Sequence, residues 1–213
     1  MKKLLQLTLS LLILVGLVSC DALGLTEEEA EFDKTYTYQV KWDVQLTGDY
    51  NHGVTIADTS NATVYTDSGA MQLGQVTSAI STDGFFGDDN AVQYIHNGTN
   101  DWGGIFFNGG TALDISSATA FKVAIKGTIS ADLTCMGLKV EGGNGSAQEL
   151  NLLSYTPATD GDWTIYTVPT ADYDLVEFSG FHGIGLWNPK SGTDLTFEGG
   201  YQATDFIVDI AIK

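Results

Sequence analysis

The chain has 213 residues and a formal net charge of −18, with 27 acidic residues against nine lysines and no arginine. Nucleic acid and polyanionic glycans are disfavoured as partners, because proteins usually hold polyanions with arginine forks and lysine clusters. Loss of Lys2 and Lys3 with a cleaved leader changes the charge from −18 to −20. The charge therefore favours a neutral partner over a polyanion.

The first twenty residues, MKKLLQLTLSLLILVGLVSC, predict a secretory leader. Two lysines precede an apolar run, residues 4–18, that is short for a membrane-spanning helix. The run ends in Leu-Val-Ser-Cys, which resembles the lipobox of bacterial lipoproteins. Residues 1–19 are therefore predicted to be a signal peptide, and Cys20 the lipidated residue that holds the protein to a membrane. The alternative is an ordinary signal peptide that ends in a chance cysteine.

Residues 20–34 are acidic and lack an apolar period, so they are predicted to form a solvated tether. Acidic residues after a lipidated cysteine resemble surface-export signals, whereas Asp21 directly after it resembles an inner-membrane retention signal. The prediction is a lipid-anchored protein of the bacterial cell envelope, with the outer membrane or cell surface favoured. Cys135 is then the remaining thiol, and its place in an apolar strand predicts a small buried side chain.

From Thr35 onward, strict alternation of apolar and polar residues predicts a half-buried strand. Its apolar side contains Tyr36, Tyr38, Val40, Trp42, Val44 and Leu46. Further strands are predicted at 62–66, 91–96, 104–107, 120–126, 135–141, 150–155, 163–168, 183–187 and 206–212. No segment has a helical period. Residues 35–213 are therefore predicted to form one all-β domain, an antiparallel β-sandwich of the jelly-roll type.

Two tryptophans lie beside glycines in the stretches DWGGIFFNGG and GFHGIGLWNP. Because strand side chains alternate between faces, Ile184 and Leu186 in the core place Trp187 on the opposite face. The same argument places Trp102 outward, with Gly104 and Phe106. Glycines on that face predict a trough beside each indole in which a flat ligand ring could lie. The alternative is that one or both tryptophans belong to the core.

A sugar ring suits such a face, because its C–H groups pack on an aromatic plane while polar neighbours bind its hydroxyls. Side chains predicted to surround the tryptophans are Lys139, Glu141, Asn151, Asn188 and His96. Exposed aromatic residues also mark protein interfaces, so the alternative function is a structural or protein-interaction β-sandwich lipoprotein.

Calcium is the ion that an acidic, oxygen-rich domain could hold. Asp209 stands alone in an apolar terminal strand, where an unpaired carboxylate is costly. Asp67 follows an early strand. These two residues are the predicted metal ligands, and the alternative for Asp209 is a solvated sheet edge.

Patterns of catalytic residues are missing from the sequence, so the prediction is a protein that is not an enzyme. Jelly-roll glucanases carry Glu-x-Asp-x-x-Glu on one strand, but after Glu31 and Asp33 this chain has Tyr36. Jelly-roll lyases use an arginine, and a serine nucleophile elbow is also missing.

Several stretches together resemble carbohydrate-binding modules with the galactose-binding-like jelly-roll fold. They span roughly residues 61–213 and include DDNAVQYIHNGTNDWGGIFF, ALDISSATAFKVAIKG, GDWTIYTVP, GIGLWNP and DFIVDIAI. The resemblance implies that Trp102 and Trp187 bind sugar, and that a structural calcium joins Asp67 to Asp209. Such modules usually accompany a catalytic domain, whereas here the domain follows a lipid anchor.

The resulting hypothesis is a non-catalytic, membrane-anchored lipoprotein that captures a neutral polysaccharide or oligosaccharide, a β-glucan above all. Its expected partners are the neutral glycan, the membrane through Cys20, and polysaccharide-degrading enzymes or a sugar transporter.

Overall fold

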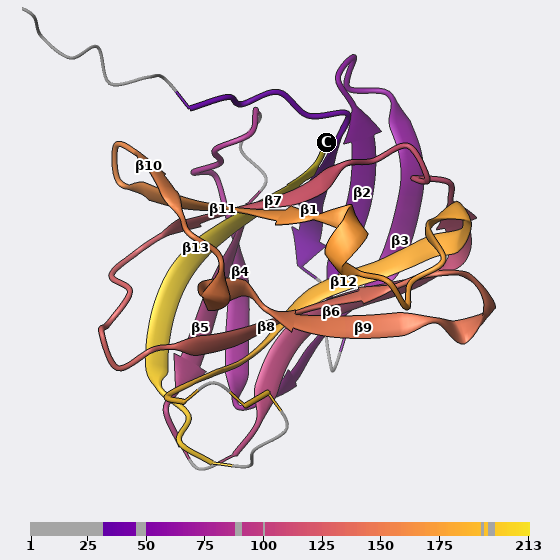
Figure 1. Ribbon diagram of the computed structural model, residues 1–213. Helices are drawn as coiled ribbons and strands as arrows, with labels where there is room; N and C mark the ends of the chain where they lie inside the picture. Colours follow the sequence, from indigo (N-terminus) through magenta and orange to yellow (C-terminus); the bar gives the residue numbers. More distant parts are fainter. Residues whose placement is uncertain (1–31, 46–49, 88–90, 100, 193, 196–198) are drawn as a thin grey trace, which may run out of the picture. The chain divides into compact units, whose positions relative to one another are not determined.

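The computed structural model describes residues 32–45, 50–87, 91–99, 101–192, 194–195 and 199–213. These residues form two packed layers of antiparallel strands (Figure 1), which confirms the predicted β-sandwich. The first layer has the order β10-β11-β7-β13-β5-β4, and the second has the order β2-β3-β6-β12-β8-β9. Strand β1 pairs with both β13 and β2, so it connects the layers.

The strands of the first layer are β4 (Val76–Ser81), β5 (Ala91–Asn97), β7 (Ala120–Lys126), β10 (Ala158–Asp160), β11 (Trp163–Pro169) and β13 (Ala203–Ile212). Those of the second layer are β2 (Tyr50–Asp58), β3 (Thr63–Gly74), β6 (Gly103–Leu113), β8 (Cys135–Glu141), β9 (Ala147–Asn151) and β12 (Phe181–Lys190), and the connecting strand is β1 (Tyr38–Gln45). Single 3-10 turns lie at η2 (Gly143–Gly145), η3 (Leu152–Ser154), η4 (Thr170–Asp172) and η5 (Phe178–Gly180). Within the described ranges, no helix is long and apolar enough to cross a bilayer.

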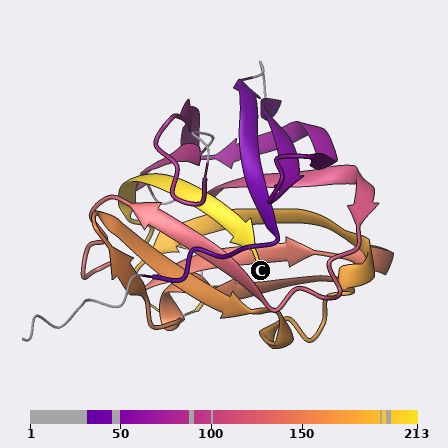
Figure 2. The same ribbon diagram turned by 90° about the horizontal axis from the view of Figure 1, so that it is seen from above.

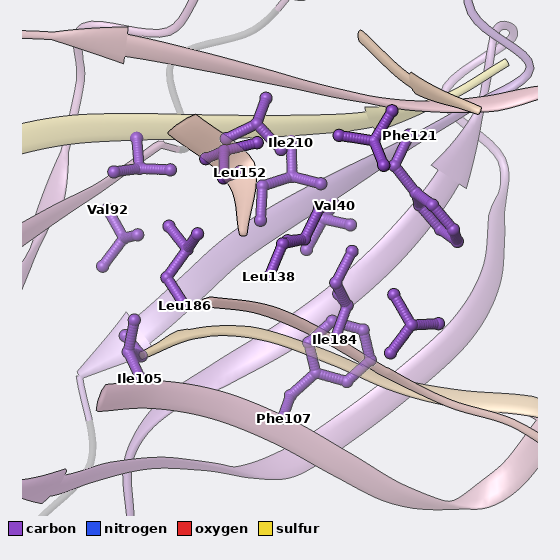
Figure 3. Close-up of a cluster of buried hydrophobic side chains, with 14 of the residues drawn as sticks. Val40, Val92, Ile105, Phe107, Phe121, Leu138, Leu152, Ile184, Leu186 and Ile210 are labelled. Carbon is purple, nitrogen blue, oxygen red and sulfur yellow. The ribbon is translucent and has the colours of Figure 1, made fainter. Parts of the chain in front are cut away.

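The main core lies between the two layers, and the predicted parity of its strands is confirmed. Ile105, Leu186 and Leu138 point from the second layer toward Val92 and Ile210 of the first (Figure 3). Each alternates along its strand with a residue on the outer face, because side-chain direction in a strand has a period of two. The core contacts of β6, β12 and β8 therefore determine which residues of these strands lie on the outer face.

Strand β1 departs from the prediction, because the middle of its polar side is buried as well, although Asp43 on that side is exposed. Val40 and Trp42 lie in the main core, but Gln39 and Lys41 are also buried. Tyr36 is predicted to lie on the same face as Val40 and Trp42, but it packs on the outer side of the first layer instead. A strand that passes between layers is covered on both faces, so alternation of residue types could not show its burial. The side chains at 44 and 46 lie outside the described residues.

Strands β2, β4 and β10 were not predicted, and the segment 150–155 was predicted wrongly. The sequences of β2, β4 and β10 are YNHGVTIAD, VTSAIS and ATD. They are rich in small or polar residues and show little alternation between apolar and polar positions. At 150–155 the strand β9 ends at Asn151 and the chain turns through η3. The Asn151 side chain accepts a hydrogen bond from the Leu153 N–H, which favours a turn over an extended strand.

A second apolar cluster covers the outer face of the first layer. Phe85 and Phe86, in the loop before β5, pack there with Trp163, Ile165 and other residues. The loop is held by Asp209, whose Oδ2 accepts hydrogen bonds from the Phe85 N–H (2.7 Å) and the Phe86 N–H (2.8 Å). The isolated acid of the last strand is therefore fully buried and bound to loop backbone, rather than at a solvated edge.

The start of the folded unit is bound to this same outer face. Phe32 packs on Phe85 at a centroid distance of 6.0 Å, and Lys34 forms an ion pair with Asp160 at 2.8 Å. The Lys122 ammonium donates to the carbonyl oxygens of Asp33 and Thr35. In Figure 2 this segment crosses the layer beside the C-terminus. The compact unit begins at Phe32, so the last three residues of the predicted tether belong to the fold.

Asp209 provides a test of the loop contact. Asp209→Ala leaves two buried N–H groups without an acceptor, so the free energy of unfolding should fall by about 2–4 kcal/mol. Burial raises the pKa of the Asp209 carboxyl. The ionised form therefore lowers stability as pH rises through that pKa, and the neutral amide of Asp209→Asn avoids this cost.

Asp209→Asn should accordingly remain within about 1 kcal/mol of the wild type at pH 7 in urea unfolding. If the asparagine variant is as unstable as the alanine variant, the negative charge itself is required and the hydrogen-bond explanation is wrong.

Candidate functional site

The outer face of β6, β12, β8 and β9 carries the candidate site, which we call the aromatic face. The strand registers place its residues in cross-strand rows. The first row is Gly104, Trp187, Gly137 and Asn151; the second is Phe106, Gly185, Lys139 and Glu149; the third is Asn108, Gly183 and Glu141. Trp102 lies at one end of the aromatic face, directly before the first residue of β6.

The two predicted tryptophans are brought together on this face. Their ring centroids are 6.1 Å apart and their planes are tilted by 33°. The Trp102 residue is 45% exposed, whereas Trp187 is half-buried. Two neighbouring indoles, one exposed and one half-buried, offer apolar ring surface against which flat apolar groups can pack.

The glycines serve a different purpose from the one predicted, because the aromatic rings themselves cover them. A Cβ on Gly104 would lie 2.5 Å from Cε3 of Trp187. Cβ atoms on Gly183 and Gly185 would lie 2.8 and 2.5 Å from ring atoms of Phe106. The expectation of an open trough beside each indole is therefore wrong. Glycine lets the rings lie close to the sheet, so the rings rather than the gaps make the surface.

Lys139 and Glu141 lie on the aromatic face as predicted, and they bind each other. The Lys139 Nζ atom is 2.6 Å from Glu141 Oε1. It also lies 5.0 Å from the Phe106 ring centroid and 5.9 Å from the Trp187 ring centroid, both within cation–π range. Lys139 therefore covers Phe106, which is 3% exposed, and leaves the tryptophans as the displayed rings.

Three polar residues of this face were missed by sequence reasoning. The Asn108 amide donates to Glu141 Oε2, and the His182 Nε2 atom is 3.8 Å from the same oxygen. Glu149 stands opposite Lys139. Alternation within AQELN places Glu149 on this face, but the predicted strand at 150–155 begins three residues after the true start of β9. His182 lies within an irregularity that shifts the register of β12 between Phe181 and Gly183, which a two-residue period does not reveal.

The two asparagines predicted to bind ligand are bonded to backbone. Asn151 Oδ1 accepts from the N–H groups of Met136 and Leu153, and its amide donates to the Thr134 carbonyl. Asn188, in a left-handed conformation at φ 48°, accepts from the Gly103 N–H at 3.0 Å. Asn151 thus links β8 to β9, and Asn188 holds the end of β12 beside the residue that follows Trp102.

His96 does not lie on the aromatic face, so the prediction that it binds ligand beside the tryptophans is wrong. It lies on β5 of the first layer, is 1% exposed, and packs on the Tyr201 ring at 5.6 Å. Its Nδ1 accepts a hydrogen bond from the Gly98 N–H, and burial lowers its pKa. His96 is a core residue near the end of a strand.

The predicted calcium ligands Asp67 and Asp209 lie on different strands. Asp67 lies on β3, opposite Val54 of β2, and its side chain is outside the described residues, so a calcium ion shared with Asp209 of β13 stays a prediction. The Asp209 Oδ2 atom already accepts two N–H groups. The described residues include no group of three or more His, Cys, Asp or Glu side chains placed to hold a metal. Calcium binding stays a prediction, and Cys20 lies outside the described residues.

No family model and no curated protein matches the chain. Among solved structures, the chain is similar to a β-1,2-glucanase from Parabacteroides distasonis, with TM-score 0.50, 11% identity, and coverage of 83% of this chain and 24% of that one. It is also similar to the family 11 carbohydrate-binding module of cellulase Lic26A-Cel5E of Clostridium thermocellum, with TM-score 0.45, 12% identity and coverage of 84% and 95%. A xylan-binding domain of carbohydrate-binding module family 22 matches with TM-score 0.39, 14% identity and coverage of 85% and 95%.

These similarities concern the fold alone. The solved structures include carbohydrate-binding modules, the family that the sequence resembles, and the chain spans about a quarter of the glucanase.

The packing of Trp187 on Gly104 provides a test of the site geometry. Gly104→Ala should push the indole off the sheet, because the new methyl group would overlap both the ring and the Leu186 carbonyl oxygen. The near-ultraviolet circular dichroism of the tryptophans should change, and stability should fall by about 1–3 kcal/mol. Gly143→Ala is the control, since its Cβ meets the flexible carboxylate of Glu177 at 3.1 Å. An unchanged spectrum and stability in Gly104→Ala would show that the ring does not lie on this glycine.

Proposed function

We propose that the protein is a non-catalytic glycan-binding protein whose aromatic face captures a neutral polysaccharide or oligosaccharide, in particular a β-glucan. The observation that carries the proposal is the pair of neighbouring indoles, the exposed Trp102 and the half-buried Trp187, 6.1 Å apart on a sheet face where glycines replace large side chains. Such rings can pack on the C–H faces of two successive sugar units, while Asn108, His182 and Glu141 lie nearby as hydrogen-bonding groups.

The charge of the protein favours a neutral ligand. The chain has 27 acids, nine lysines and no arginine. Lys139, the cation closest to the tryptophans, is already paired with Glu141 at 2.6 Å. A uronate polymer would therefore meet net repulsion and would lack a bidentate partner.

The ligand class can be tested by affinity electrophoresis of the protein in gels that contain laminarin, a cellulose derivative, xylan or alginate. The wild type should be retarded by a neutral glucan. Trp102→Ala and Trp187→Ala should each weaken binding about tenfold, since a ring-packing contact of about 0.5–1.5 kcal/mol and buried ring area are both lost.

The two variants should differ in stability. Trp102→Ala should leave the melting temperature unchanged because the side chain is exposed. Trp187→Ala should cost about 1–2 kcal/mol, because its ring packs on Gly104 and on Phe106. Trp163→Phe, in the second cluster of the other layer, is the control and should bind normally. Retardation by alginate alone would contradict a neutral ligand, and retardation by none of the glycans would favour the protein-interaction alternative.

We further propose that Cys20 carries a lipid anchor, so that the domain is held at the bacterial cell envelope near polysaccharide-degrading enzymes or a sugar transporter. The leader and the Leu-Val-Ser-Cys sequence support this proposal. Cys20→Ser should move the protein from the membrane fraction to the soluble fraction of a bacterial host, because the acyl chains that hold it are missing. Cys135→Ser is the control, since Cys135 is buried in β8. Persistent membrane association of Cys20→Ser would refute the anchor.

A further inference from the structure

Glu149 lies on the aromatic face with its carboxylate folded over a glycine. Its backbone is opposite Lys139, but its side chain extends along β9 toward Gly137, where a Cβ would lie 1.8 Å from Glu149 Oε1. Gly137 is the register partner of Trp187 on β12. The absence of a side chain at 137 therefore creates the space that the carboxylate occupies next to the strand of Trp187.

The Glu149 carboxylate is partly withdrawn from water and retains free acceptor sites. Glu141, in contrast, contacts Lys139, Asn108 and His182. Among the residues that the structure describes, none forms a hydrogen bond or an ion pair within 4 Å with the Glu149 carboxylate. Burial raises the pKa of Glu149, while the charges of Lys139 and Lys190 act in the opposite direction. An ionised carboxylate in this position can accept hydrogen bonds from a ligand.

We infer that Glu149 binds the ligand of the aromatic face, by accepting hydrogen bonds from neighbouring hydroxyl groups of the sugar unit next to the one that packs on Trp187. The inference rests on the proposed glycan-binding function. Because the acceptor is a carboxylate, this sugar unit must be uncharged and must carry free neighbouring hydroxyls.

The spacing across the strands supports this assignment. The Trp187 ring lies over Gly104 of β6, and the Glu149 carboxylate lies over Gly137 of β8, on the two sides of β12. Two strand spacings correspond to about 10 Å, comparable with a disaccharide. A glycan that crosses β12 can thus place one apolar ring face on the indole and the hydroxyls of the next ring at the carboxylate. A carboxylated sugar at the second position would bring two negative charges together.

The test uses the full chain, purified in detergent, and calorimetric titration with a soluble neutral glucan oligosaccharide that retards the wild type in gels. Glu149→Gln should weaken binding about tenfold, because hydrogen bonds to an ionised acceptor are stronger than those to an amide oxygen. The control is Asp162→Asn, an exposed carboxylate in the turn between β10 and β11 of the other layer. It removes the same charge away from the aromatic face and should leave binding unchanged.

Thermal stability separates a binding role from a structural one. The raised pKa means that the ionised Glu149 carboxylate lowers stability as pH rises through that pKa, so Glu149→Gln should be as stable as the wild type or more stable at pH 7. Wild-type affinity should fall as pH decreases through the same pKa, and the variant should lack this dependence. The other titratable groups that interact with Glu149 are Lys139, Lys190, Cys135 and Tyr173, and all of them are retained in the variant.

Each result has a distinct meaning. Normal affinity in Glu149→Gln, combined with loss of binding in Trp187→Ala, would overturn the role of Glu149 and leave the proposed function intact. Lower stability with normal affinity would show that Glu149 is a structural residue. Failure of the wild type to bind any neutral glycan would overturn the proposed function and, with it, this inference.

Discussion

The close approach of aromatic rings to the sheet backbone is the constraint on which the aromatic face depends. A ring can lie flat on a strand only where the neighbouring residue lacks a Cβ, and Gly104 meets this condition for Trp187, as Gly183 and Gly185 do for Phe106. The opposite faces of the same strands carry Ile105, Ile184 and Leu186 in the main core. Because both faces are set by one alternation, packing of the core also fixes the orientation of the displayed rings.

Electrostatics complement this geometry. Lys139 forms an ion pair with Glu141 and covers Phe106, so the positive charge beside the tryptophans is neutralised within the protein. Glu149 remains a half-buried acceptor. The face therefore combines apolar rings with carboxylate acceptors and little available positive charge, a chemistry suited to hydroxyl-rich neutral molecules and unsuited to polyanions.

The sequence predicted those parts of the structure that follow from local alternation. The bounds of β7 and β8 and the outward direction of Trp102 and Trp187 are examples. It could not show that β1 is covered on both faces, because that depends on which strands lie beside it. The roles of Asn151 and Asn188 also escaped prediction, since their partners are backbone groups brought near by turns. His96 was misplaced because strand parity does not reveal which layer a strand joins.

The attachment of residues 32–36 to the first layer also determines how the domain would bear a mechanical load. Tension applied through Phe32 acts on a segment held by the Lys34–Asp160 ion pair and by Lys122. It then acts on β1, which pairs with β2 over most of its length and with β13 at residues 38–40. Pulling β1 along its axis requires many ladder bonds to break together. Strands β2 and β3 lie between β1 and the four strands of the aromatic face, so tension on β1 does not act directly on the rings of Trp102 and Trp187.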